Sequence, residues 1–101
     1  MSIFGRKKAQ NTPHTWDGTE RFGPVKLASC DFRDGQQSLI ATRMYTEDMI
    51  PVLQQMDEFG FECIEMWGGA TFDACVRFLK EDPWERIRIF KQYCKKTPLR
   101  M

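Results

Sequence analysis

Apolar residues occur in two patterns along this chain. Short continuous apolar runs predict strands, and recurrence at steps of three and four predicts the helices between them. Val25–Cys30 and Phe61–Met66 are short, largely apolar runs, and a polar loop containing glycine follows each. Such runs predict strands of a parallel sheet, and Val25–Cys30 is apolar enough to predict burial on both faces. Leu99–Met101 has the same character and predicts the start of a third strand.

A helix is predicted between the first two strands, because apolar residues recur there at steps of three and four. They are Met49, Val52, Leu53, Met56 and Phe59. The helix begins near Thr46 or near Asp48. With Thr46 as the N-cap, Pro51 falls beyond the first turn and removes one hydrogen bond; with Asp48 as the cap, Pro51 costs little. Gly60 supplies the left-handed residue that ends a helix.

Two further helical segments are predicted after the second strand. Thr71 is the expected cap of the first, and Phe72, Cys75, Val76 and Leu79 are predicted to share one face of it. The second begins at Asp82, an N-cap residue, with Pro83 at the first helical position. Its predicted buried face comprises Trp84, Ile87, Phe90 and Cys94. Strands alternating with helices predict an α/β fold with a parallel sheet.

Composition and charge exclude several classes of function. The chain has 101 residues, of which 42% are hydrophobic, and a formal net charge of +1. It has no basic stripe of the kind that binds nucleic acid and no apolar run near the roughly 20 residues that span a membrane. Residues 1–24 are polar and predict a flexible tail ahead of a domain at 25–101. No secretory signal is present, so a cytoplasmic location is expected.

The cysteines and the one histidine carry no recognisable motif. The cysteines are Cys30, Cys63, Cys75 and Cys94, and their spacing fits neither a zinc site nor a redox pair. Buried free thiols are therefore expected. His14 stands alone in a polar segment, where an exposed position without catalytic function is expected.

The residues that suggest chemistry follow the two predicted strands. Arg33, Asp34 and Gln37 lie on the loop after the first strand, where parallel α/β folds bind ligands. Asp34 could hold a metal ion, Arg33 could face an anion, and Gln37 could hydrogen-bond a carbonyl. The same residues also fit an ordinary polar turn with a solvated Arg33–Asp34 pair.

Glu65 lies within the second strand, where a carboxylate needs a partner. Arg33, at the end of the neighbouring strand, is one candidate partner, and a local backbone group is the other. Gly68 and Gly69 follow the same strand. A glycine pair lets the backbone approach a ligand closely, but it also makes ordinary turns.

Several motifs in order resemble one known family. They are Arg33–Leu39, Ala41–Met44, Trp67–Asp73 and Glu81–Arg86. They resemble the N-terminal part of the biotin-dependent carboxyltransferase barrel, and the resemblance runs over residues 25–101. That family includes pyruvate carboxylase, its separate carboxyltransferase subunit, the oxaloacetate decarboxylase α subunit and the transcarboxylase carboxyltransferase subunit.

The resemblance implies a fold and a role for each candidate residue. The fold would be the first two to three βα units of a TIM (β/α)₈ barrel, incomplete in this chain. Asp34 would ligate a divalent metal, which is zinc, manganese or cobalt in the family. Arg33 and Gln37 would belong to the pyruvate or oxaloacetate pocket, Glu65 would orient the arginine, and the pair Gly68–Gly69 would line the pocket.

The implied reaction moves a carboxyl group between biotin and pyruvate or oxaloacetate. Biotin would arrive on a separate domain or subunit, and the parent enzyme would be a homo-oligomer, alone or with other carboxylase subunits. The family's other metal ligands, a carbamylated lysine and a His-x-His pair, and a further substrate arginine are missing from these 101 residues. The chain alone is therefore expected to be inactive. The early position of the motif favours the separate-subunit or decarboxylase type over single-chain pyruvate carboxylase.

Two departures and two alternatives remain. The family usually has histidine where Gln36 stands, which removes an acid–base group, and Ala28–Asp31 differs from the usual Thr/Asp-rich strand end. One alternative is an aldol-type lyase or acyl-CoA condensing synthase of the wider metal-dependent superfamily, which shares the Arg-Asp-Gly-x-Gln loop. Trp67–Asp73 speaks against it. The other is a truncated chain or binding module without catalysis.

Overall fold

The structure is a computed structural model that describes residues 24–101. Nearly all of the predicted tail, together with His14, lies outside the described residues. Two of the helical segments, η1 and η2, are π-helical. The elements in chain order are β1 (Ala28–Ser29), η1 (Asp31–Gly35), α1 (Gln36–Ile40), α2 (Thr46–Phe59), β2 (Cys63–Glu65), α3 (Gly69–Ala74), η2 (Cys75–Leu79), α4 (Pro83–Tyr93) and β3 (Leu99–Arg100).

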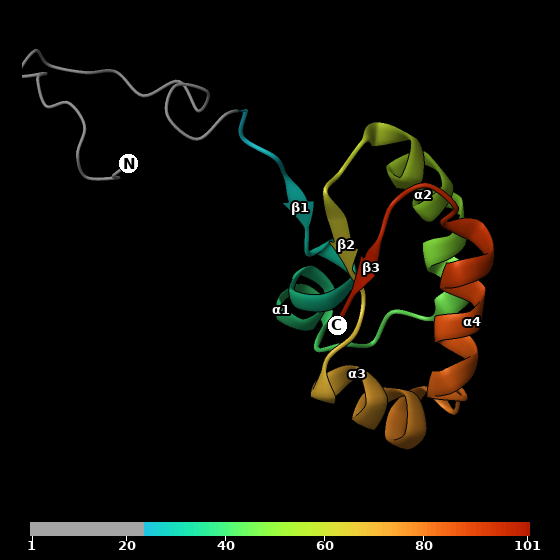
Figure 1. The fold of residues 1–101 in the computed structure, drawn as a ribbon. Coiled ribbons are helices and arrows are strands. Elements are labelled where there is room, and N and C mark those ends of the chain that lie inside the picture. Colours follow the sequence, from blue (N-terminus) through green and yellow to red (C-terminus); the bar gives the residue numbers. More distant parts are fainter. Residues whose placement is uncertain (1–23) are drawn as a thin grey trace, which may run out of the picture.

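The three strands form one parallel sheet in the order β1-β2-β3, as Figure 1 shows. Ala28 is in register with Cys63, and Ile64 with Leu99. Helices α2 and α4 lie side by side on one side of the sheet, and α3 lies near the ends of the strands. The predicted α/β fold with a parallel sheet is confirmed. Because the strands are parallel, their carboxyl ends meet at one edge, which we call the rim.

The core fills the space between the sheet and helices α2 and α4. It comprises Phe32, Met49, Leu53, Ile64, Met66, Trp67, Phe90 and Cys94. The rings of Phe32 and Phe90 pack at right angles with centroids 5.3 Å apart, so the segment after β1 is anchored to α4. A fully buried side chain of this size contributes about 1.5–3 kcal/mol of transfer free energy.

Several burial predictions are wrong. Val25 and Leu27 are 54% and 57% exposed, because they precede the paired residues of β1. Each helix packs through a narrower stripe than its periodicity suggests. Residues at the margin of the predicted faces are exposed, namely Val52, Phe59, Phe72, Val76 and Trp84. Cys63, Cys75 and Cys94 are buried free thiols as predicted, but Cys30 is exposed.

The helix ends show which local signals hold. Gly60 adopts a left-handed φ of 97° and ends α2 as predicted. Asp82 caps α4 by accepting a hydrogen bond from the backbone N–H of Trp84 at 2.9 Å, also as predicted. Neither proposed cap of α2 is right, since Tyr45 occupies the N-cap and Pro51 lies inside the helix. Within residues 24–101, no helix is long and apolar enough to cross a membrane.

Candidate functional site

Three charged side chains from three segments meet at the rim. Arg33 lies in the π-helical turn η1, directly after β1, while Glu65 and Arg100 are the last residues of β2 and β3. Glu65 and Arg100 are in register across the parallel pairing, so both side chains project from the same side of the sheet. The parallel arrangement therefore produces a charge cluster from residues 32 and 35 positions apart.

Arg33 and Glu65 form the strongest contact in this cluster. The Nη2 and Nε atoms of Arg33 donate to the same carboxylate oxygen, Oε1 of Glu65, at 2.8 and 3.1 Å. The hydrogen bond to Glu65 raises the pKa of Arg33 above its ordinary value. Of the two partners predicted for Glu65, the structure shows the arginine. The second oxygen of Glu65, Oε2, lies 3.7 Å from Nη1 of Arg100.

Asp34 lies beside the same guanidinium. Its Oδ1 is 3.5 Å from Nη1 of Arg33, and its side chain is exposed. A solvated Arg33–Asp34 contact is thus present, as the simpler interpretation predicted, but it coexists with the Arg33–Glu65 pair. Both carboxylates contact one guanidinium, so they lie on the same side of the molecule.

The glycine pair and Gln37 relate differently to this cluster. A Cβ atom at Gly68 would lie 3.4 Å from Cδ of Arg33, so Gly68 packs closely against the aliphatic part of the arginine side chain. The structure shows no such contact at Gly69. Gln37 is exposed on α1. Among residues 24–101, no hydrogen bond joins its side chain to Arg33, Asp34 or Glu65.

The described residues do not by themselves fit a metal site. Within residues 24–101, no group of three or more His, Cys, Asp or Glu side chains is placed to hold a metal ion. Protein metal sites usually need three ligands or more. Asp34 by itself could therefore supply one ligand of a divalent metal and no more.

Thr71 fixes the backbone of Gly68 through a hydrogen bond. It was predicted to be the N-cap of its helix, but that position is held by Gly68, and Thr71 lies inside α3. Its hydroxyl oxygen accepts a hydrogen bond from the backbone N–H of Gly68 at 3.1 Å. The buried threonine therefore fixes the backbone that lies against Arg33.

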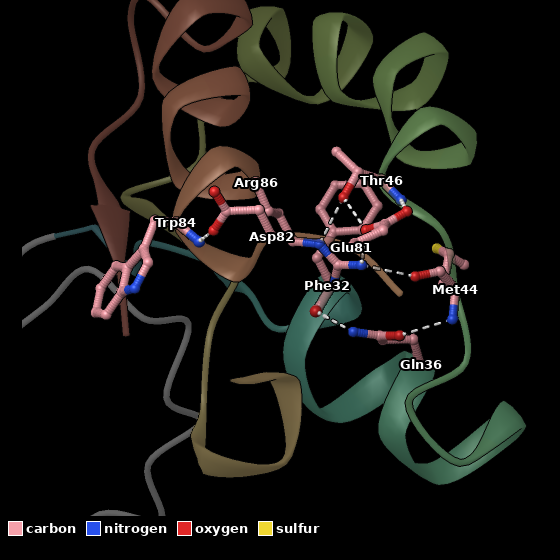
Figure 2. Close-up of polar contacts among 8 residues, drawn as sticks. All are labelled: Phe32, Gln36, Met44, Thr46, Glu81, Asp82, Trp84 and Arg86. Atoms are coloured by element: carbon pink, nitrogen blue, oxygen red, sulfur yellow. Dashed lines mark hydrogen bonds and ion pairs between the residues drawn. The ribbon is translucent and has the colours of Figure 1, made fainter. Parts of the chain in front are cut away.

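Sequence reasoning missed a buried arginine, Arg86, whose side chain is 1% exposed. Its Nη2 donates to Oε1 of Glu81 and to the carbonyl of Met44, both at 2.9 Å, and its Nε donates to the hydroxyl of Thr46 at 2.7 Å (Figure 2). The signal was present in the sequence, because Arg86 is four residues before Phe90 and shares its buried face.

Glu81 completes this buried cluster. Its carboxylate accepts hydrogen bonds from the backbone N–H and the hydroxyl of Thr46, at 3.1 and 2.7 Å. Burial alone would raise the pKa of Glu81. The hydrogen bonds from Thr46 and the charge of Arg86 outweigh burial, so the pKa of Glu81 is lowered. Glu81 therefore stays ionised beside the arginine.

The structure also assigns a definite place to Gln36. The residue is buried, its Nε2 donates to the carbonyl of Phe32 at 3.0 Å, and its Oε1 accepts from the backbone N–H of Met44 at 3.2 Å. An amide satisfies both partners at once, since it carries a donor and an acceptor. Gln36 is therefore a structural residue beneath the rim.

Comparison with known proteins gives three informative similarities, although no family model matches the chain. A pyruvate carboxylase subunit of Methanocaldococcus jannaschii is 62% identical over 77 residues, which are 76% of this chain and 14% of that protein. The 2-oxoglutarate carboxylase large subunit of Hydrogenobacter thermophilus is 54% identical over 69 residues, 68% of this chain and 11% of that protein.

The third similarity is to a solved structure. The carboxyl transferase domain of Rhizobium etli pyruvate carboxylase, solved with oxamate and biotin, matches with a TM-score of 0.68 and 40% identity. The match covers 74% of this chain and 13% of that one. This chain thus spans about one seventh of the length of such relatives.

The fold and the rim define a class, a parallel α/β protein with an anchored arginine at the carboxyl ends of its strands. The sequence and structural similarities then give the family. The chain belongs to the carboxyltransferase domains of pyruvate carboxylase and related biotin-dependent enzymes, of which it covers a part.

Proposed function

We propose that this chain supplies part of a carboxyltransferase site in a larger enzyme, which moves a carboxyl group between biotin and pyruvate or oxaloacetate. The similarity to proteins named for pyruvate carboxylation supports the reaction type. Because this chain covers about one seventh of such relatives, the remaining site residues would come from elsewhere in the enzyme. The two βα units and the third strand would then be successive parts of a (β/α)₈ barrel.

The observation that carries the proposal is the anchored guanidinium of Arg33. A guanidinium has five N–H donors, and Glu65 accepts from two of its nitrogens. The side chain is 35% exposed, so its remaining donors can reach a ligand at the rim. A cation fixed in this way suits an anion whose charge grows during a reaction.

Oxaloacetate decarboxylation produces such a charge. When the bond between the methylene carbon and the departing carboxyl carbon breaks, its electron pair passes into the keto group and forms the enolate of pyruvate. The carboxyl group goes to biotin, and a proton from biotin returns to the enolate carbon. Arg33 would stabilise the enolate oxygen or the substrate carboxylate, Gln37 would hydrogen-bond the keto acid, and Gly68–Gly69 would let it approach the backbone.

The proposed cofactors and partners follow from the family. Biotin would be carried on a separate domain or subunit, and the enzyme would be a homo-oligomer, alone or with other carboxylase subunits. A divalent metal, when bound, would polarise the keto oxygen, with Asp34 as one ligand. The carboxyl acceptor stays open within the class of 2-oxo acids, because a relative at 54% identity is named for 2-oxoglutarate.

The test compares variants of the complete enzyme that contains this segment. Arg33→Lys keeps the charge but cannot make the two-nitrogen contact with Glu65. We expect it to lower kcat for oxaloacetate decarboxylation in the presence of biotin by about 10²–10³-fold. Arg77→Lys is the matched control. Arg77 forms an exposed ion pair with Asp73, with Nε and Oδ1 3.0 Å apart, and within residues 24–101 it forms no ion pair with Glu65 or Asp34.

Two outcomes would contradict the proposal in different ways. If Arg33→Lys keeps activity within about twofold of the unmutated enzyme, the rim is not the site. If the unmutated enzyme transfers no carboxyl group to or from any 2-oxo acid, the reaction itself is wrongly assigned.

A further inference from the structure

The turn that carries Arg33 has an unusual backbone. In η1 the N–H of Gly35 donates to the carbonyl of Cys30 at 3.0 Å, five residues back, and the N–H of Gln36 donates to the carbonyls of Asp31 and Arg33. Such π-helical turns are rare and occur often at functional sites. At η1 the turn is also supported by a side-chain hydrogen bond.

Gln36 supplies that support from inside the protein. Its backbone N–H is engaged with Asp31 and Arg33, and its side-chain amide reaches back to the carbonyl of Phe32, the residue directly before Arg33. The other end of the amide accepts from the backbone of Met44, in the loop that precedes α2. One buried side chain therefore joins the Arg33 turn to the loop that begins the next element.

Arg86 holds that loop from the opposite side. Both backbone polar groups of Met44 are hydrogen-bonded to side chains: its N–H donates to Gln36 and its carbonyl accepts from Arg86 (Figure 2). Arg86 is fixed in turn by Glu81 and Thr46. The hydrogen bonds form one continuous path from α4, through Met44 and Gln36, to the backbone beside Arg33.

We infer that Gln36 and Arg86 are positioning residues that set the direction of Arg33 through Met44. This inference rests on the proposed function of Arg33. Glu65 orients the guanidinium from its charged end, whereas the path through Gln36 fixes the backbone from which the side chain starts. Within the described part of the chain, neither Gln36 nor Arg86 has a hydrogen bond to Glu65, so each acts only through the turn.

The main test is Gln36→Met in the complete enzyme. Methionine has nearly the same length and volume as glutamine but removes both hydrogen bonds. Hydrogen–deuterium exchange of the peptide spanning residues 31–45 reads the turn directly and needs no turnover. We expect exchange there to rise about tenfold or more, from the loss of two buried hydrogen bonds. We expect kcat for oxaloacetate decarboxylation to fall about tenfold or more, as misplaced catalytic groups cause.

Asp57→Asn is the matched control for a purely structural effect. Asp57 is also buried and hydrogen-bonded, but it holds the segment after α4, at the opposite end of the sheet from the rim. At a temperature where both variants are folded, we expect Asp57→Asn to keep kcat within about twofold and to leave exchange in residues 31–45 unchanged.

Arg86→Lys tests the far end of the path and serves if Gln36→Met does not fold. Lysine keeps the charge beside Glu81 but cannot donate to Thr46, Glu81 and Met44 in the same geometry. We expect a smaller rise in exchange over residues 31–45, and in the double variant less than the product of the two single effects.

The inference is overturned if folded Gln36→Met and Arg86→Lys leave exchange over residues 31–45 unchanged, or if their loss of kcat equals that of Asp57→Asn. A wholly inactive unmutated enzyme would instead contradict the proposed function. In that case the exchange measurement alone decides whether Gln36 and Arg86 fix the turn.

Discussion

Asp57 is the buried carboxylate on which the connection from α4 to β3 depends. Its Oδ1 accepts from the backbone N–H groups of Thr97 and Lys96, at 2.8 and 3.0 Å, and its Oδ2 accepts from that of Lys95 at 2.9 Å. Burial alone would raise the pKa of Asp57. The hydrogen bonds from Lys95, Thr97 and Lys96 outweigh burial and hold the pKa well below its ordinary range.

Asp57→Asn keeps the shape of the side chain and removes its charge. The amide nitrogen then faces the N–H of Lys95, so that bond is lost, and the remaining bonds become neutral ones. Hydrogen bonds to charged groups are worth about 1.5–3 kcal/mol and neutral ones about 0.5–1.5 kcal/mol. We therefore expect the hydrogen-bonded state of residues 94–97 to lose about 3 kcal/mol. Where exchange follows the opening equilibrium, this loss makes exchange about 100-fold faster.

The pH dependence has a definite sign. Since folding lowers the pKa of Asp57, the folded protein binds that proton more weakly than the unfolded chain does. The stabilisation is complete above the ordinary carboxyl value of about 4 and is lost as the pH falls through the lower folded-state value. The difference between Asp57→Asn and the unmutated protein should therefore be constant from about pH 5 to pH 8.

The assay is hydrogen–deuterium exchange of a peptide covering residues 94–99. Glu58→Gln is the control, because Glu58 neighbours Asp57 but forms an exposed ion pair with Lys96. Exposed pairs contribute little, so exchange in that variant should change less than about threefold. If Asp57→Asn also stays within about threefold of the unmutated protein, the assigned role of the carboxylate is wrong.

Two further predictions concern the thiols and the isolated chain. Iodoacetamide near pH 8 should label exposed Cys30 first and spare buried Cys75 and Cys94. Burial raises the pKa of both buried thiols, and burial together with the neighbouring Asp57 raises the pKa of Cys94 to about 11. Equal labelling rates for Cys30 and Cys94 in mass spectrometry would refute this. The 101-residue chain alone should self-associate in sedimentation experiments, because it exposes large apolar side chains such as Leu39 at 84% and strand-edge residues such as Leu27; a monomer with a cooperative melt would contradict it.

Local signals in the sequence predicted much of the fold because they act over a few residues. The stop at Gly60 depends on one left-handed backbone conformation, and the start at Asp82 depends on a side chain two residues from its partner. The third strand was predicted at residues 99–101, and Leu99–Arg100 indeed pairs with β2. The two helix-end interactions are complete within a short segment, so the sequence reveals them, whereas the third strand was predicted from its apolar character and its place after a helix.

Burial depends on neighbours that the local sequence does not name. Periodicity placed Val52 and Trp84 on apolar faces, but the stripe of each helix that meets the sheet is narrower, and both side chains are exposed. Trp84 instead stacks on Trp67 with ring centroids 5.7 Å apart, so one face of its ring is covered. A periodic pattern thus predicts which residues share a face but not how much of it is covered.

Arg33 and Arg86 show why the site could be predicted only in part. Each arginine pairs with a glutamate, at 2.8 and 2.9 Å, and the sequence alone does not rank them. They differ in exposure, since 35% of the Arg33 side chain is accessible but only 1% of that of Arg86. Arg86 directs Nε and Nη2 to groups of its own chain and has no surface on which to bind a ligand. Arg33 donates hydrogen bonds to Glu65, lies 3.5 Å from Asp34 and is still partly exposed at the rim. Of these two arginines, only Arg33 therefore combines a fixed position with an accessible surface.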